Sequence, residues 1–177
     1  TQADTMSSGI MNQSINPSML STGFEDGTKQ GWAPRIGEEK LSVTKQDAKS
    51  GSDSLLITNR KHPYSGPKLN IFGMLKKGSK YQISVWVKLT PGEAPSKLRV
   101  SIQRGYQGTN HYDTVAPNTK VTADQWVLLS GAYQLQSDVD SLTVYVESAS
   151  GLASFYIDDF SLKTSKAPPI QMNIPSV

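Results

Sequence analysis

The chain has 177 residues, 36% of them hydrophobic, and the absence of cysteine excludes disulfides, zinc–thiolate sites and thiol nucleophiles together. The net charge of +3 comes from scattered basic residues, whereas a nucleic-acid-binding surface needs them clustered. No apolar run approaches the roughly 18 residues that cross a bilayer, so we expect neither a nucleic-acid nor a membrane partner.

The two ends differ in composition from the middle of the chain. Residues 1–18 are polar and aperiodic, which predicts a flexible leader. Residues 166–177 contain three prolines and are typical of a semi-rigid linker to another domain, with a frayed end as the alternative. We therefore expect one ordered unit at residues 19–165.

Seven stretches of the middle are rich in β-branched and aromatic residues and predict strands. They are residues 40–46, 53–59, 80–90, 96–104, 125–135, 141–148 and 154–163. Turn residues separate them, among them Gly51, Gly92, Gly105 and Gly151. No long segment has helical periodicity, so the spacing predicts an all-β fold, either a two-sheet sandwich or a barrel.

Alternation along the strands predicts which side chains face the core. The odd positions from Tyr81 to Leu89 form one apolar stripe. In "SLTVYVES" (141–148), Val144 and Val146 share one parity, whereas Tyr145 and Glu147 share the other. Successive strand residues point to opposite faces, so this pattern predicts an aromatic ring and a carboxylate side by side in solvent.

The last predicted strand, "SFYIDDFSLK", changes parity in its middle. Phe155 and Ile157 share one parity, and Phe160 and Leu162 continue on the other. A β-bulge at Asp158-Asp159 would produce this slip.

Acidic residues suggest two kinds of site. A glycosidase needs two carboxylates about 5 to 10 Å apart across a cleft, but the acids here are sequence neighbours, which point to opposite faces of a strand. His62 and His111 lack metal-ligand spacing, and no Ser–His–Asp signature is present. A small jelly-roll hydrolase or lyase is therefore the less favoured alternative.

The second kind of site is one for a hard cation. First and last strands of a sandwich often pair, which would bring Glu25 close to Asp159. Calcium takes 6–8 oxygen ligands, and the turn at residues 47–52 could supply carbonyl oxygens. The alternative is that both acids are solvated turn residues.

Aromatic and polar residues outside the predicted core suggest a third kind of site. The candidates lie in loops or on the outward parity, and they are Trp32, Arg35, Arg60, His62, Tyr64, Tyr106, Asn110, His111, Tyr112, Tyr145 and Glu147. A ring stacks on the apolar face of a sugar while planar polar groups bind its hydroxyls. The alternative, that rings only cover sheet ends, is stronger for the tryptophans, Trp32, Trp86 and Trp126.

The order of motifs is similar to that of family 22 carbohydrate-binding modules of bacterial xylanases. The shared motifs, over about residues 19–164, are "GFEDG…GW.PR", "SGSDSLLITNR…YSGP", "YQISVWVK", "QWVLLSGAY", "YVES" and "FYIDDFSL". The resemblance implies a β-sandwich jelly roll of two antiparallel sheets. It also implies a concave cleft that binds internal stretches of xylan, sometimes mixed-linkage β-glucan, and a structural calcium ion (Ca2+) away from the cleft.

Carried over by position, the resemblance implies two sets of residues. The ligand-binding residues would be Arg35, Tyr64, Tyr112, Tyr145 and Glu147, to which the outward parity of Gln103 adds a sixth. Calcium would be bound by the side chains of Glu25 and Asp159, with carbonyls from near Thr22 and Lys49. Tyr64 departs from the family pattern, in which tryptophan is usual, and presents a smaller stacking face.

The function implied is that of a non-catalytic, secreted, monomeric module that brings a linked xylanase to its polysaccharide. The alternative is a structural module that stabilises a neighbouring glycoside hydrolase domain.

Overall fold

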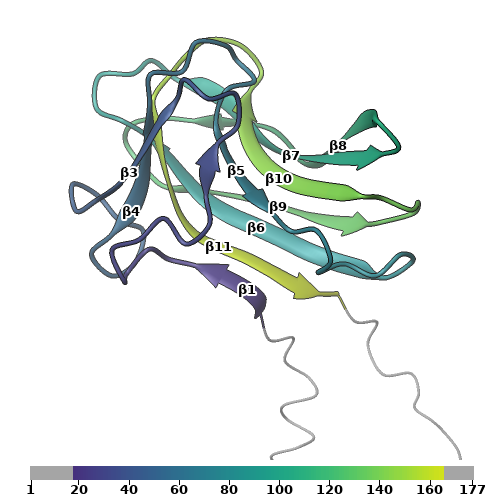
Figure 1. The fold of residues 1–177 in the computed structure, drawn as a ribbon. Helices are drawn as coiled ribbons and strands as arrows, with labels where there is room; N and C mark the ends of the chain where they lie inside the picture. The colour runs from purple at the N-terminus through teal and green to yellow at the C-terminus, as the bar shows by residue number, and fades with distance from the viewer. Residues whose placement is uncertain (1–17, 166–177) are drawn as a thin grey trace, which may run out of the picture.

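The computed structural model describes residues 18–165, in which every regular element is a β-strand (Figure 1). The strands are β1 (Ser18–Thr22), β2 (Ala33–Pro34), β3 (Lys40–Thr44), β4 (Ser54–Thr58), β5 (Pro67–Asn70), β6 (Lys80–Leu89), β7 (Ser96–Tyr106), β8 (Thr109–Val121), β9 (Val127–Gln134), β10 (Ser141–Ser148) and β11 (Phe155–Thr164). This part of the chain contains no helix that could span a membrane.

The strands form two antiparallel sheets, which confirms the expected β-sandwich jelly roll. One sheet has the order β3-β4-β11-β6-β9, with β1 also paired to β11, and the other has the order β2-β5-β10-β7-β8. The predicted leader, apart from Ser18 in β1, and the predicted linker lie outside the described residues.

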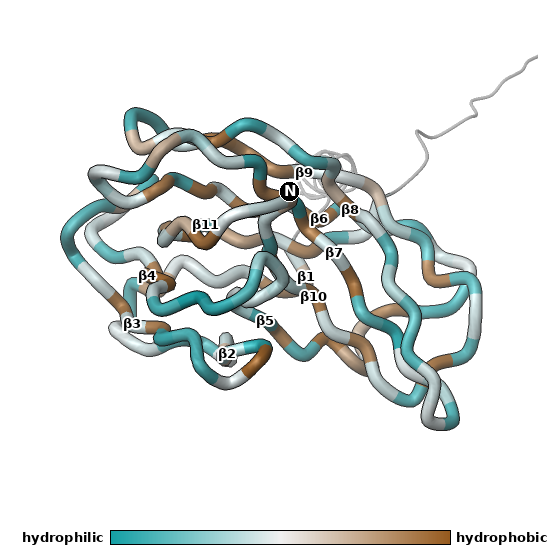
Figure 2. Tube along the Cα trace, turned by 90° about the horizontal axis from the view of Figure 1, so that it is seen from above, coloured by the Kyte–Doolittle hydropathy of each residue, from teal (hydrophilic) through white to brown (hydrophobic). Residues whose placement is uncertain are grey.

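The core lies between the two sheets and follows the alternation of the sequence. In β6 the stripe from Tyr81 to Leu89 is at most 2% exposed, and in β10 Val144 and Val146 are at most 1% exposed. Hydrophobic and hydrophilic positions accordingly alternate along the strands (Figure 2). Each fully buried Val, Leu or Ile side chain contributes about 1.5–3 kcal/mol, so this face holds the two layers together.

All seven predicted strands are present within a few residues, but β1, β2, β5 and β8 were not predicted. The largest omission is β8, because its polar sequence and Pro117 do not read as a strand. It has one sheet neighbour, β7, and an edge strand tolerates both features. The turn is formed by Gln107 and Gly108, both at positive φ (50° and 84°), so the expectation of a turn at Gly105 was wrong.

The bulge in β11 is as expected, whereas the strand that pairs with β11 at the start of the fold is β1, which was not predicted, and not the first predicted strand, β3. Thr22 pairs with Phe160, and the register of β11 against β6 shifts between Asp158 and Ser161. Asp159 takes a positive φ of 49° within this shift. The bulge keeps Phe160 in the core although its parity differs from that of Ile157.

The three tryptophans lie away from the outer face of the five-stranded sheet. Trp32 is 3% exposed, its ring meets Phe160 edge-on at 5.3 Å, and its Nε1 donates to Thr22 Oγ1 at 2.9 Å. Trp86 belongs to β6 of the six-stranded sheet, and the Trp126 ring lies 6.2 Å from that of Tyr156 in β11. They pack in the core or against the six-stranded sheet, and none of them lines the cleft.

Candidate functional site

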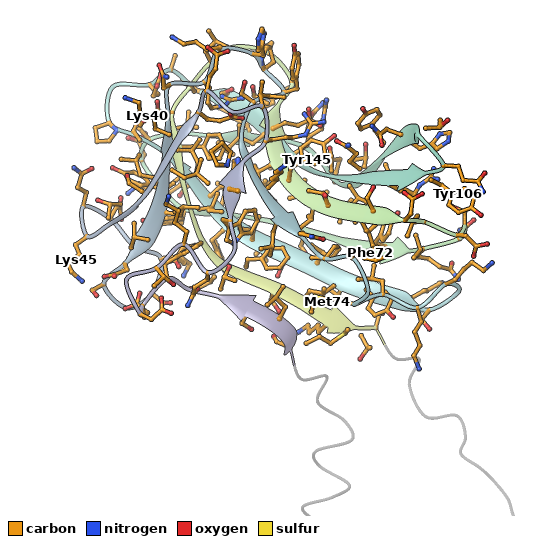
Figure 3. The ribbon with its side chains drawn as sticks, in the orientation of Figure 1. Lys40, Lys45, Phe72, Met74, Tyr106 and Tyr145 are labelled. Carbon is orange, nitrogen blue, oxygen red and sulfur yellow. The ribbon has the colours of Figure 1, made fainter. Side chains whose placement is uncertain are left out.

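A hollow of about 500 Å³ opens on the outer face of the five-stranded sheet, and we call it the cleft. Its lining is Arg35, Ile36, Tyr64, Arg99, Gln103, Tyr112, Tyr145 and Glu147. All six residues proposed for ligand binding are in this set, although they come from five separate segments of the chain. Tyr145 lies on β10, with the β7–β8 hairpin beside it ending at Tyr106 (Figure 3).

The floor of the cleft is formed by Tyr145 and Glu147. Their parity is as expected, since both point away from the core that Val144 and Val146 enter. Their predicted exposure was wrong, because Tyr145 is only 2% exposed and Glu147 only 5%. The guanidinium of Arg35 covers the Tyr145 ring at 3.8 Å from its centroid, and this contact removes the ring from solvent.

Burial has electrostatic consequences at the floor. Burial raises the pKa of Tyr145 to about 12. The negative charge of Glu147 raises this pKa further, whereas the positive charge of Arg35 lowers it. The Glu147 carboxylate accepts hydrogen bonds from Arg99 Nε at 3.1 Å and Ser101 Oγ at 2.7 Å. Sequence reasoning missed Arg99 and Ser101; cross-strand pairing of β7 with β10 puts them opposite Glu147 and Tyr145.

Arg35 connects the floor of the cleft to its walls. Its Nη1 donates to the carbonyl of Tyr64 at 2.9 Å, and its Nη2 donates to Gln103 Oε1 at 3.3 Å. Because Arg35 engages the oxygen of the Gln103 amide, the NH₂ end of that amide is left to donate elsewhere. Arg35 Nε is buried without an acceptor among residues 18–165.

The walls of the cleft are two accessible rings. Tyr64 is 47% exposed and Tyr112 is 59% exposed. The His62 ring stacks on the Tyr64 ring with centroids 4.8 Å apart and planes 3° apart, which restricts the orientation of Tyr64. Tyr112 stands on β8 directly opposite Gln103. The cleft therefore presents two rings and several hydrogen-bonding groups to one space.

The buried side chain of Arg60 fixes the loop that carries Tyr64. It is 3% exposed and donates to the carbonyls of Ser65, Pro63 and Ala153 at 2.7–2.8 Å and to Ser148 Oγ at 2.6 Å. Burial lowers the pKa of Arg60 to about 10, and no carboxylate bonds to it in the described chain. Burying this charge costs free energy, and the hydrogen bonds of the guanidinium connect the Tyr64 loop to the end of β10.

Glu39 fixes the chain segment that carries Arg35 in a similar way. It is 3% exposed and accepts from the backbone N–H groups of Ile36, Gly37 and Gly66. A Cβ at Gly66 would collide with the carbonyl of Val146 in β10, so only glycine fits there. The expectation that Arg60 belongs to the sugar-binding surface was wrong, and Glu39 and Gly66 were missed as supports, since the burial of all three is set by distant segments.

The second expected site has Glu25 and Asp159 as its carboxylates, and the structure adds Asp158 beside them; we call these three acids the acid cluster. Glu25 accepts from the backbone N–H groups of Ser52 and Asp53 at 3.0 and 2.9 Å, and these bonds lower its pKa. Asp159 Oδ2 accepts from Ser50 Oγ at 2.6 Å. The turn at residues 47–53 thus joins the two predicted metal-binding carboxylates.

Asp158 is the most buried member of the acid cluster. It is fully buried, and its Oδ2 accepts from the backbone N–H groups of Lys49 and Ser50 at 2.9 and 3.3 Å. Burial and the neighbouring Asp159 charge raise its pKa to about 6. The ammonium of Lys49 lies 4.3 Å from the Trp86 ring centroid, so only its backbone is near the acids.

The side chains of this region could bind a hard cation only if backbone carbonyl oxygens served as additional ligands. Within residues 18–165, no three His, Cys, Asp or Glu side chains are grouped as a metal site. Glu25 and Asp159 offer carboxylate oxygens, and the expected carbonyl ligands would come from near Thr22, at the end of β1, and Lys49, in the turn at residues 47–53.

Two packed antiparallel sheets with an aromatic, polar cleft on one of them define a carbohydrate-binding β-sandwich. Residues 16–153 match the family described as a carbohydrate binding domain. The chain belongs to the family 22 carbohydrate-binding modules and is a binding module, not a catalytic domain.

Two solved structures and one curated relative illustrate the similarity. The CBM22-1 xylan-binding domain of Paenibacillus barcinonensis Xyn10C has a TM-score of 0.81 at 35% identity, covering 87% of this chain and 98% of that domain. The C-terminal family 22 module of Clostridium thermocellum Xyn10B has a TM-score of 0.78 at 28% identity, covering 85% of this chain and 96% of that one. Endo-1,4-beta-xylanase C of P. barcinonensis is 37% identical over 152 residues, which is 85% of this chain but only 14% of the length of the enzyme.

Proposed function

We propose that the cleft binds internal stretches of a xylan chain without making or breaking a bond. The observation that carries this proposal is the pair of exposed rings, Tyr64 and Tyr112, above a floor of hydrogen-bonding groups. Sugar rings stack on such faces, and the Arg35, Gln103 and Glu147 groups suit hydroxyls. The similar domain of Xyn10C is named a xylan-binding domain, which supports the choice of polysaccharide.

The contacts within the cleft assign different roles to its tyrosines. Tyr64 and Tyr112 have accessible faces and would stack on sugar units. Tyr145 already has Arg35 against its ring, so it would act chiefly by holding the guanidinium in place. Arg35 Nε, buried without an acceptor in the described chain, supports a role beyond stability, because such donors are rare in folded proteins.

Binding of this kind is weak and depends on a site that exists before the ligand arrives. Arg60 fixes the Tyr64 loop and Glu39 fixes the Arg35 segment, so little ordering is required on binding. An open cleft with two stacking rings suits a dissociation constant in the micromolar to millimolar range, about −4 to −8 kcal/mol. We further propose that the module is secreted as part of a xylanase, whose effective concentration at the polysaccharide it would raise.

Affinity electrophoresis in gels containing xylan, mixed-linkage β-glucan or cellulose tests the proposal. We expect xylan to retard the protein most, β-glucan less and cellulose least. Tyr112→Ala should lose the retardation, whereas Tyr106→Ala, an exposed ring at the hairpin end, should keep it. Equal mobility in all three gels would refute binding and favour a structural role beside a hydrolase domain.

We also propose that Glu25 and Asp159, with carbonyls near Thr22 and Lys49, bind a structural calcium ion. Its task would be to join β1, the bulge of β11 and the turn at residues 47–53. A chelator should lower the melting temperature of the protein while leaving its affinity for xylan unchanged. An unchanged melting temperature would count against the site.

A further inference from the structure

A second hollow of about 750 Å³ lies on the same sheet, and its cationic residues are Lys97 and Lys120. We call it the lysine hollow; it is lined by residues 93–97, Asn118, Lys120 and residues 149–153. None of the residues that line it also lines the cleft.

The lysine hollow adjoins the cleft along β7. Lys97 precedes Arg99 by two residues, so both side chains leave the same face of the sheet. Arg99 Nη1, at the edge of the cleft, donates to Asn118 Oδ1 in the hollow at 3.4 Å. Just after β10, the backbone N–H of Ala149 donates to the carbonyl of Lys97 at 2.9 Å. The hollow therefore lies next to the cleft, and a bound chain that runs along β7 would pass beside it.

The two lysines are directly opposite each other and uncompensated. Lys97 pairs with Lys120 in the β7–β8 register, and both are exposed. Like charges at facing positions destabilise a sheet. In the described part of the chain neither lysine forms an ion pair. Glu93 is the one acid in the lining, and its Oε2 accepts a hydrogen bond from the backbone N–H of Ser154 at 2.7 Å.

We propose that the lysine hollow takes the carboxylate of an acidic sugar substituent on a xylan chain that lies in the cleft. This inference rests on the proposed function. The two ammonium groups supply the charge, Asn118 supplies an amide, and Leu152, 50% exposed, supplies apolar surface for the substituent ring. The carboxylate of the ligand would then reduce the repulsion between the two lysine ammonium groups.

Titration calorimetry with two xylo-oligosaccharides of equal main-chain length, one neutral and one bearing a uronic acid, tests this inference. We expect the protein to bind the acidic oligosaccharide about three- to tenfold more tightly, the range for two exposed charge pairs. The double variant Lys97→Gln/Lys120→Gln should lose the preference and bind the neutral oligosaccharide as before. Added salt should reduce the preference of the unmodified protein.

The matched control is Lys40→Gln/Lys80→Gln, which removes the same charge from exposed positions on the other sheet and should keep the preference. Equal affinity of the unmodified protein for both oligosaccharides would overturn the inference and leave the proposed function intact. Failure of both to bind would overturn the proposed function, and the inference with it. Binding of polygalacturonate as tightly as acidic xylan would also overturn it, since no xylan chain would then be needed.

Discussion

The cleft and the acid cluster are both groups of polar side chains, yet they use their hydrogen-bonding capacity differently. In the acid cluster the Glu25 and Asp158 oxygens accept from the backbone N–H groups of one turn. In the cleft, side chains bond mainly to other side chains, and two rings remain in solvent. The first arrangement fixes the chain, whereas the second leaves surface for a ligand. Mutations in the two regions should therefore have separable effects on stability and affinity.

The largest effect is expected at Arg60, where support for the cleft and stability of the fold coincide. Arg60→Ala leaves the buried carbonyls of Ser65 and Ala153 without their donor, which should cost about 3–5 kcal/mol in the free energy of unfolding. Urea denaturation measures the loss. Lys61→Ala, at the exposed neighbouring position, should change stability by less than about 0.5 kcal/mol. A loss below about 1 kcal/mol for Arg60→Ala would show that water replaces the guanidinium.

The acid cluster should impose a pH dependence on stability that the cleft does not share. With its pKa raised to about 6, Asp158 keeps a proton in the folded protein that the unfolded chain releases above its ordinary pKa of 3.8. In the presence of a chelator, the free energy of unfolding should thus fall as the pH rises from about 4 to 6, by up to about 3 kcal/mol. Thermal unfolding across this interval measures it.

Asp158→Asn should flatten that slope, whereas Asp138→Asn, in an exposed pair with Lys77, should preserve it. The carboxyls with lowered pKa values, such as Glu25, act in the opposite sense and in a lower range, because their stabilisation is lost as the pH falls below about 4. A slope that survives Asp158→Asn would assign the effect to another group.

An intermediate effect, confined to affinity, is expected at Tyr112. Tyr112→Ala removes a ring that is 59% exposed, so it should weaken xylan binding about tenfold, which is about 1.4 kcal/mol, with the melting temperature unchanged. Titration calorimetry and thermal unfolding on the same preparation separate the two quantities. A lower melting temperature would place the Tyr112 ring among the supports of the fold.

The smallest effect is expected at Tyr64, whose stacking face is smaller than that of a tryptophan. Tyr64→Trp enlarges the stacking face and should tighten binding about two- to fivefold. Because the His62 ring backs that of Tyr64, His62→Ala should weaken binding by a similar factor through loss of orientation. Unchanged affinity in both variants would exclude Tyr64 from the stacking surface.

The sequence predicts those features of the fold that depend on neighbouring residues. The alternation in β6 and β10 and the parity slip at Asp158 are local patterns, and the structure contains all three. The strand β8 escaped prediction because an edge strand needs little hydrophobicity on its exposed face.

The sequence predicts much less about the environment of the site residues. Parity places Tyr145 on the outer face but gives no sign that Arg35, 110 positions earlier, covers its ring. In the same way, nothing local to Arg60 or Glu39 shows that each is buried among backbone groups of two segments. Exposure is a property of tertiary contacts, and the supports of the cleft are formed entirely by such contacts.

The pairing of β1 with β11 also determines how the molecule responds to mechanical force. Ser18 and Lys163 are partners at one end of the pair, and Thr22 and Phe160 are partners at the other. Tension applied at Ser18 and Lys163 would break the hydrogen bonds between β1 and β11 one after another and not all at once. Peeling would run toward Gly23 and Asp159, where the acid cluster begins. The cleft, on the opposite sheet, would remain intact until that point was passed.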